Sequence, residues 1–150
     1  MILIIFLLKK LRKKQAKKSF LYYLDVYPQG FNSIESRFTL AEIYSEEENF
    51  NEALNYYNQI IDLGSNDYRE EALVKASKIL INDLLLEDAV VLLEELNDVA
   101  VFSENKSYSL FNLMRVYYQL NEFVKALDLS LIHISEPTRL LSIWYSLIML

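Results

Sequence analysis

The residues best suited to chemistry in this sequence are carboxylates that occur side by side. They form groups at 46–48, 70–71 and 94–95, and such groups can act as general acids and bases or bind a hard cation. Adjacent residues of a helix point about 100° apart, so neighbouring glutamates do not converge on one atom. We therefore interpret these groups as solvated helix faces and turn charges, and we predict no metal site.

Other residue types that carry catalysis are scarce. The chain has no cysteine, which excludes a disulfide framework, a zinc–cysteine cluster and a thiol nucleophile. Its single histidine, His133, has no serine or aspartate placed to complete a catalytic arrangement. Gly30 and Gly64 are the only glycines, too few for a phosphate-binding loop. The sequence therefore predicts a protein that is not an enzyme and binds no cofactor.

The composition favours long helices as the elements that hold these side chains. Only two glycines and two prolines occur in 150 residues, so few positions force a turn. Charge is distributed unevenly: seven of the 15 basic residues precede Ser19, whereas all 21 acidic residues follow it. The basic run could meet phosphate or anionic lipid, but its phasing with Ala16 and Phe20 favours a solvated helix face. Because the rest of the chain is acidic, we predict no nucleic-acid partner.

The apolar segment at residues 1–8 is too short to span a membrane, which takes about 20 residues. A secretory signal would place its positive charges before the apolar stretch, whereas here they follow it. Two interpretations stay open, a truncated membrane anchor and half of a repeat that lacks its upstream partner. The repeat described next favours the second.

Three columns of residues recur with the same spacing. Each column has successive separations of 36 and 37 residues. The columns are Ala53, Ala89 and Ala126; Phe50, Leu86 and Phe123; and Tyr44, Leu80 and Tyr117. Counting 37 residues back from Ala53 reaches Ala16, so the register extends to the N-terminus.

Each unit has the pattern of two amphipathic helices, A and B, joined by a short turn. In the first full unit Leu40, Ala41 and Tyr44 share one face of helix A, and small alanines allow helix B to approach closely. Asp67 and Glu70 have the spacing of a capping box. The predicted helices cover about 10–26, 33–47, 50–63, 67–83, 87–98, 105–120 and 122–133, with no strand.

This pattern resembles the tetratricopeptide repeat (TPR) family. The first unit matches through Leu40, Ala41, Tyr44, Phe50, Ala53 and Tyr57. The family's tryptophan position is occupied by Arg37 and Leu110, and the units are longer than the usual 34 residues. The resemblance implies an all-α, TPR-like helical-hairpin solenoid, a fragment of a right-handed superhelix, acting as a protein-binding scaffold. Residues 1–32 would form a partial repeat, a truncated helix A plus helix B, and residues 33–128 the full repeats.

A second resemblance concerns bacterial envelope TPR proteins. It covers about residues 16–128 and rests on the segment FLYYLDVYPQG and its Tyr-Pro-x-Gly turn. It implies a periplasmic or cell-envelope location. Two alternatives to the scaffold stay open: a membrane-tethered accessory protein that contacts the membrane through residues 1–18, and a structural spacer without a ligand.

Residues 129–150 are set apart by their origin. The string LSLIHISEPTR at 129–139 is similar, residue for residue, to the translation of a transposase mosaic-end adapter used in sequencing libraries. We therefore interpret 129–150 as a non-native tail, with the natural frame ending near Asp128. In the alternative, residues 129–134 continue the last helix and Pro137 ends it.

The concave wall formed by the A helices is the predicted partner-binding surface, because helical-repeat arrays bind extended peptides or partner helices there. The residues that the repeat register assigns to it are Glu35, Phe38, Glu42, Glu46, Glu71, Val74, Lys78, Asn82, Tyr108, Phe111, Arg115 and Tyr118. The wall grades from acidic to aromatic, which predicts a protein or peptide partner with basic residues at one end and an apolar anchor at the other. In the alternative, Phe38, Phe111 and Tyr118 only pack between neighbouring A helices.

Overall fold

The structure, a computed structural model, describes residues 2–134, with side chains described for residues 11–130. This part of the chain is helical and contains no strand. Its helices are α1 (Ile2–Val26), α2 (Ser33–Glu46), α3 (Phe50–Asp62), α4 (Arg69–Asn82), α5 (Leu86–Val99), α6 (Ser103–Gln119) and α7 (Phe123–Ile134). Six of these agree with the predicted ranges to within about two residues.

The first helix corrects one expectation. A truncated helix A followed by helix B was predicted within residues 1–32, but the structure has the single helix α1 from Ile2 to Val26. The physical reason is that no glycine or proline occurs before Pro28, and leucine and lysine are good helix formers, so nothing ends the helix near Lys9.

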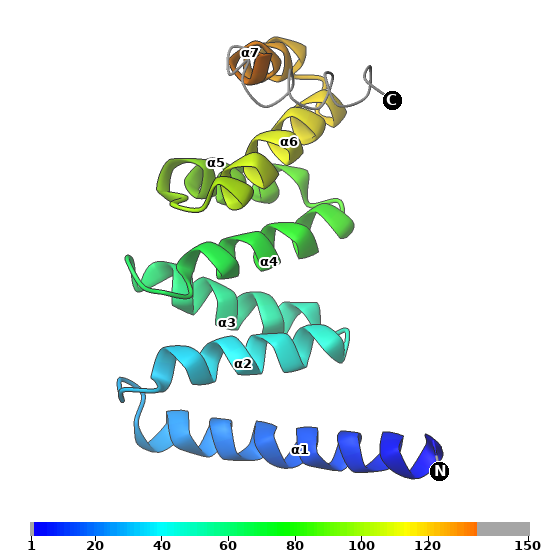
Figure 1. The fold of residues 1–150 in the computed structure, drawn as a ribbon, viewed down its shortest axis with the longest axis vertical. Coiled ribbons are helices and arrows are strands. Elements are labelled where there is room, and N and C mark those ends of the chain that lie inside the picture. The colour runs from blue at the N-terminus through cyan, green and yellow to red at the C-terminus, as the bar shows by residue number, and fades with distance from the viewer. Residues whose placement is uncertain (1, 135–150) are drawn as a thin grey trace, which may run out of the picture.

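The helices stack one above another along the long axis of the molecule, with α1 at one end and α7 at the other (Figure 1). Helices α2 and α3, α4 and α5, and α6 and α7 pack as hairpins, and each hairpin also contacts the next. Helices α4 and α6 touch as well, so two successive A helices are direct neighbours. Beyond the repeats, α7 runs through residues 129–134, as the alternative for the tail proposed; Pro137 lies outside the described residues.

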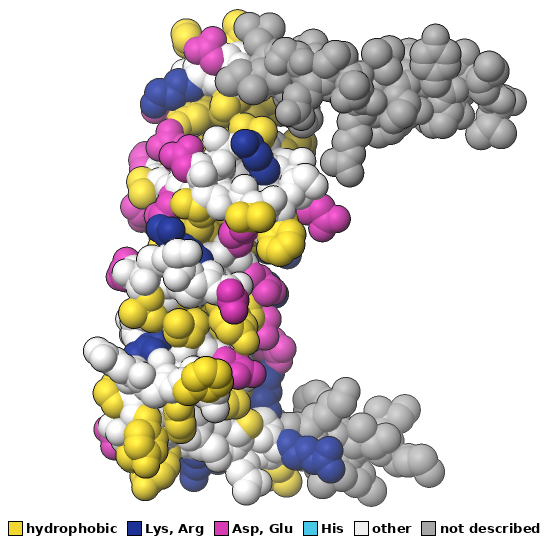
Figure 2. Space-filling view, turned by 60° about the vertical axis from the view of Figure 1, so that its left-hand side comes forward, with side chains coloured by type: hydrophobic (Ala, Val, Ile, Leu, Met, Phe, Trp, Pro, Cys, Tyr) yellow, Lys and Arg dark blue, Asp and Glu magenta, His cyan; other side chains and the backbone are white. Residues whose placement is uncertain are grey.

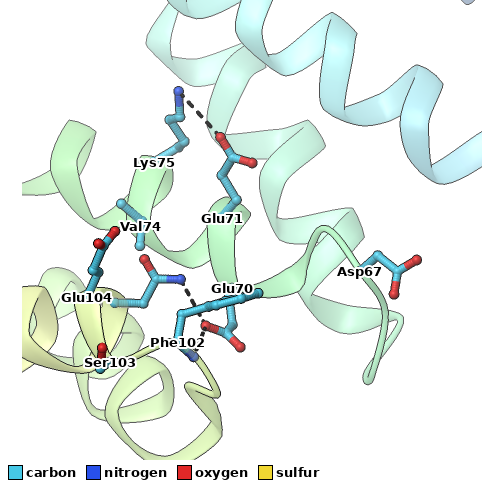
Figure 3. Close-up of a pocket in the computed structure, with 9 residues that line it drawn as sticks. Asp67, Glu70, Glu71, Val74, Lys75, Phe102, Ser103 and Glu104 are labelled. Atoms are coloured by element: carbon cyan, nitrogen blue, oxygen red, sulfur yellow. Dashed lines mark hydrogen bonds and ion pairs between the residues drawn. The ribbon is translucent and has the colours of Figure 1, made fainter.

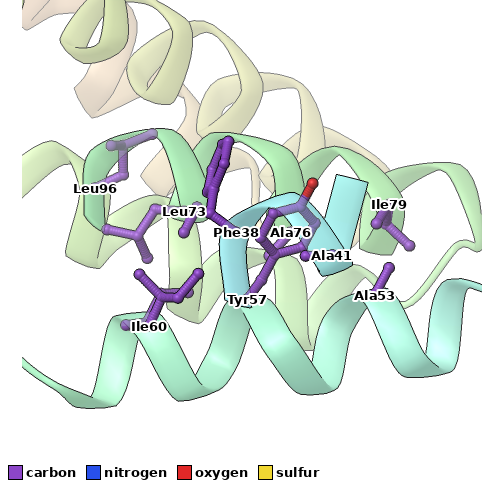
Figure 4. Packing of buried hydrophobic residues seen from close by; sticks show 11 residues of the cluster. Phe38, Ala41, Ala53, Tyr57, Ile60, Leu73, Ala76, Ile79 and Leu96 are labelled. Carbon is purple, nitrogen blue, oxygen red and sulfur yellow. The ribbon is translucent and has the colours of Figure 1, made fainter. Parts of the chain in front are cut away.

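The alanine column lies in the core, whereas the column of Phe50, Leu86 and Phe123 does so only in part, because Phe50 and Leu86 are half-buried and Phe123 is 53% exposed. Ala53 and Ala89 are fully buried and Ala126 is 8% exposed, which permits the close helix approach inferred for them. Figure 4 shows Tyr57 and Ile60 of α3 in the first cluster beside Leu73 of α4. Helices α4 to α7 enclose a second cluster, which includes Ala89 of α5 and Ala126 of α7.

The turns within the hairpins repeat as regularly as the core. Glu48, Leu84 and Asn121, which follow the period of 36 and 37 residues, have φ angles of 58°, 60° and 61°. After each of them, an amide donates a 2.9 Å hydrogen bond to the carbonyl five residues earlier, that of Tyr44, Leu80 or Tyr117. These bonds define a Schellman motif, which ends a helix with a left-handed residue.

The Tyr-Pro-x-Gly turn at 27–30 has a structural explanation. A Cβ atom on Gly30 would lie 2.5 Å from the Tyr23 hydroxyl and 3.0 Å from the Tyr27 Cβ, so the turn needs glycine for close packing. Arg37 of α2 donates a 2.7 Å hydrogen bond to the Pro28 carbonyl and fixes the turn against the first hairpin.

Candidate functional site

Three of the predicted wall residues are packing residues. Phe38 is only 6% exposed, with ring centroids 5.9 Å from Tyr57 and 5.1 Å from Tyr68, so its placement on an open wall was wrong. The cause is that α4 packs against the first hairpin and brings Tyr68 over the Phe38 ring. Val74 and Tyr108 are half-buried, and the Tyr108 hydroxyl lies 3.5 Å from the Val74 carbonyl oxygen, so this pair holds α4 against α6.

Acidic residues at the first-unit end of the wall lie at the surface, and most have partners within the chain. Glu42 accepts a 3.2 Å hydrogen bond from Lys75, whose ammonium is also 3.8 Å from Glu71. Glu46 forms an ion pair with Lys13 of α1. Glu35 is exposed. On the side shown in Figure 2, acidic side chains are more prominent than basic ones.

The basic residues of α1 have a partly different role from the one predicted. Lys17 donates a 2.5 Å hydrogen bond to Glu47 and lies 3.7 Å from the centre of the Tyr44 ring. Together with the Lys13 contact, this pairing holds α1 to the end of α2. Lys14 and Lys18 are exposed, as predicted for a solvated helix face.

A hollow of about 550 Å³ lies between α4 and α6 (Figure 3). Two of its lining residues, Glu71 and Val74, belong to the predicted wall. The lining residues that the sequence interpretation missed are Asp67, Glu70, Lys75, Phe102, Ser103, Glu104 and Asn105. Phe102 is 67% exposed, so the hollow carries one accessible aromatic side chain. Most of the charged residues that line it are acidic.

Glu70 fixes the shape of this hollow. The predicted capping box of Asp67 and Glu70 is wrong, because α4 begins at Arg69 and its N-cap residue is Tyr68, with no side-chain capping hydrogen bond. The Tyr68 amide donates to the Asn66 side chain at 3.0 Å. The Glu70 carboxylate accepts hydrogen bonds from the Val101 amide at 2.8 Å and the Phe102 amide at 3.4 Å.

A third hydrogen bond to Glu70 comes from the Asn105 side chain at 2.8 Å (Figure 3). Partial burial on its own raises the pKa of the Glu70 carboxyl. The bonds from Asn105, Val101 and Phe102 together outweigh burial, so the pKa is lower than its ordinary value. Glu70 therefore ties the α5–α6 connection to α4 as a carboxylate.

Helix α6 presents a second surface, which we call the α6 strip: Phe111, Arg115 and Tyr118. Residues spaced by four and three share one helix face. Phe111 is 60% exposed and Tyr118 is 66% exposed, so the alternative that they only pack between A helices does not hold for them. Tyr118 contacts Phe123 of α7 edge-on, with ring centroids 5.5 Å apart. Lys78 and Asn82 of α4, two more residues of the predicted wall, are also exposed.

The chemistry available at these surfaces is recognition by charge and by aromatic contact. Among the described residues, no group of three His, Cys, Asp or Glu side chains is placed to hold a metal ion. No helix in the same part of the chain combines the length and apolar character that crossing a membrane requires.

Comparisons with known proteins agree with the fold. No family profile and no curated protein matches the sequence. Among solved structures, the chain is similar to a candidate kinesin light chain of Podosopora anserina with nearly identical TPR-like repeats (TM-score 0.62, 16% identity, covering 87% of this chain and 70% of that one). A second crystal structure, of a substituted form of that protein, gives a TM-score of 0.58 at 16% identity, and the match covers 80% of this chain but only 64% of that one. The predicted all-α, TPR-like helical-repeat fold is therefore confirmed.

Proposed function

We propose that this chain is a protein-binding scaffold, and that the exposed A-helix residues form its binding surface. The observation that carries the proposal is the α6 strip, where two large aromatic side chains of a well-packed helix are each about two-thirds exposed. Exposed aromatic residues beside a charged residue are typical of binding hot spots. The TPR-like fold, in which repeats stack to form an extended surface, supports the same function.

The partner proposed for this surface is a peptide segment with an apolar anchor and a basic end. The anchor would contact Phe111 and Tyr118, and the basic end would reach the first unit, where Glu35 is exposed. The pairing of Glu42 with Lys75 reduces the negative charge that this end of the wall offers to a partner.

The proposal is tested by screening a peptide array with the full chain and with two variants, Phe111→Ala and Glu42→Lys. We expect Phe111→Ala to abolish binding of most captured peptides and Glu42→Lys to weaken those with a basic end. Phe31→Ala is a matched control, because Phe31 is fully exposed outside the A helices. A chain that captures no peptide above background would be a structural spacer instead. Captured peptides whose binding neither variant changes would show that the A-helix residues are not the binding surface.

A location in a bacterial envelope has less support. It rests on the Tyr-Pro-x-Gly turn, and close packing of Gly30 against Tyr23 accounts for that turn without any envelope function. Membrane contact through residues 1–18 is likewise a proposal from sequence alone. Lys13 and Lys17, which lie in that segment, already bind acidic residues of α2 and the turn that follows it.

A further inference from the structure

The C-terminal parts of α4 and α6 form a basic region in an otherwise acidic body. Residues 75–82 and 107–119 contain Lys75, Lys78 and Arg115 but no acidic residue. Lys75 forms ion pairs with Glu42 and Glu71. Lys78 and Arg115 are exposed, and neither forms an ion pair with any residue in the described part of the chain. Two cations on this surface are therefore available to a ligand.

The repeat places these two cations in one row. Lys78 and Arg115 are 37 residues apart, which is the repeat spacing, so they occupy equivalent positions on α4 and α6. These two helices contact each other directly. The row runs next to the aromatic residues of the α6 strip, because Phe111 and Tyr118 lie one helical turn before and after Arg115. Positive charge and apolar area thus occur together.

We infer that the α6 strip, with Lys78 beside it, binds an extended peptide segment in which an acidic residue stands between two apolar residues. This inference rests on the proposed scaffold function and names the chemistry of the partner at the third-unit end of the wall. The two apolar side chains contact Phe111 and Tyr118, and the carboxylate contacts Arg115 in the fork geometry that guanidinium groups favour.

The spacing of the strip fixes the order of the ligand's residues. Along α6, Phe111 and Tyr118 are separated by roughly 10 Å, with Arg115 between them, at about 1.5 Å per residue. In an extended segment, side chains two residues apart point the same way and are about 6.6 Å apart. The pattern apolar–x–acidic–x–apolar spans about 13 Å, slightly more than the strip, so the two outer apolar side chains can reach Phe111 and Tyr118 by leaning inward while the central carboxylate lies over Arg115.

Charge elsewhere on the wall limits where an acidic segment can bind. Glu71 and Glu104 line the hollow at the N-terminal ends of α4 and α6. An acidic ligand extended in that direction would be repelled, so it must remain over the C-terminal parts of the two helices. This repulsion distinguishes the inferred ligand from the basic end proposed for the first unit.

The test uses the full chain and a short fluorescein-labelled peptide with a central glutamate, a leucine two residues away on either side, and serine and glycine elsewhere. A second peptide has lysine in place of the glutamate. Fluorescence anisotropy at low ionic strength gives both dissociation constants. We expect the glutamate peptide to bind at least about tenfold more tightly than the lysine peptide, and Arg115→Glu to reverse that preference.

Lys106→Glu is the matched control, because Lys106 is exposed on the same helix about two and a half turns before Arg115 and therefore faces the opposite side of the helix. Lys106→Glu changes the net charge by the same amount as Arg115→Glu, and we expect it to leave the preference for the glutamate peptide intact. Circular dichroism of each variant shows whether the helices persist. Equal binding of both peptides, no binding of either, or a preference that survives Arg115→Glu would overturn the inference. If array peptides still bind the chain in that case, the scaffold function stands; if none binds, both fail.

Discussion

Replacing Glu70 with alanine tests whether this residue holds the second and third repeats together. The substitution removes an acceptor of hydrogen bonds from Val101, Phe102 and Asn105. A hydrogen bond to a charged group is worth about 1.5–3 kcal/mol when it is shielded from water. Val101 and Phe102 are 85% and 67% exposed, so water can replace Glu70 as the acceptor of their amides. We therefore expect a total loss of only about 2 kcal/mol.

Urea unfolding followed by circular dichroism measures this loss, with Glu71→Ala as the matched control. Glu71 is the next residue of α4, is exposed, and has only the 3.8 Å ion pair with Lys75, so its removal costs less than about 0.5 kcal/mol. If Glu70→Ala destabilises the chain no more than Glu71→Ala does, then Glu70 does not tie the repeats together.

The pH dependence of the same contact gives a second readout. The pKa of Glu70 is lower in the folded state than in the unfolded state, because its hydrogen bonds outweigh the effect of burial. Its contribution to stability is therefore present above the ordinary glutamate pKa and is lost as the pH falls through the folded value. We expect the stability difference between the wild type and Glu70→Gln to shrink on acidification. A constant difference from neutral pH down to about pH 3 would contradict this assignment.

Three further changes have expected outcomes. Leu84→Gly should raise the free energy of unfolding by about 0.5–1 kcal/mol in urea titrations, since leucine at φ 60° is strained and its side chain is 73% exposed. Ala89→Leu should lower it by about 1–3 kcal/mol, because Ala89 is fully buried between helices; a neutral effect would mean that the helices can move apart. Deleting residues 129–150 should preserve peptide selectivity but reduce solubility in a sedimentation assay, since Leu129 packs against the second cluster.

The helices and the core columns could be predicted because they depend on periodicity within one segment. Alanine at 53, 89 and 126 and the apolar residues around it follow from helical spacing alone. Side-chain partners across segments could not be predicted in this way. Phe38 is buried because Tyr68, thirty residues later, lies against it. The spacing of Glu70 from Asp67 predicts a capping residue, whereas its hydrogen-bond donors come from the α5–α6 connection. Both cases depend on how hairpins stack, which the pattern within one helix does not contain.

The backbone conformation of the turns within the hairpins also depends on how the helices pack. A left-handed residue ends α2, α4 and α6, yet the residues there are glutamate, leucine and asparagine rather than glycine. Leucine in this conformation costs about 1–2 kcal/mol, so local preference does not select it. In all three hairpins the second helix must reverse direction and pack its buried alanine against the first helix. Packing of the hairpin therefore sets the turn geometry, and the strain at Leu84 is the consequence that Leu84→Gly would measure.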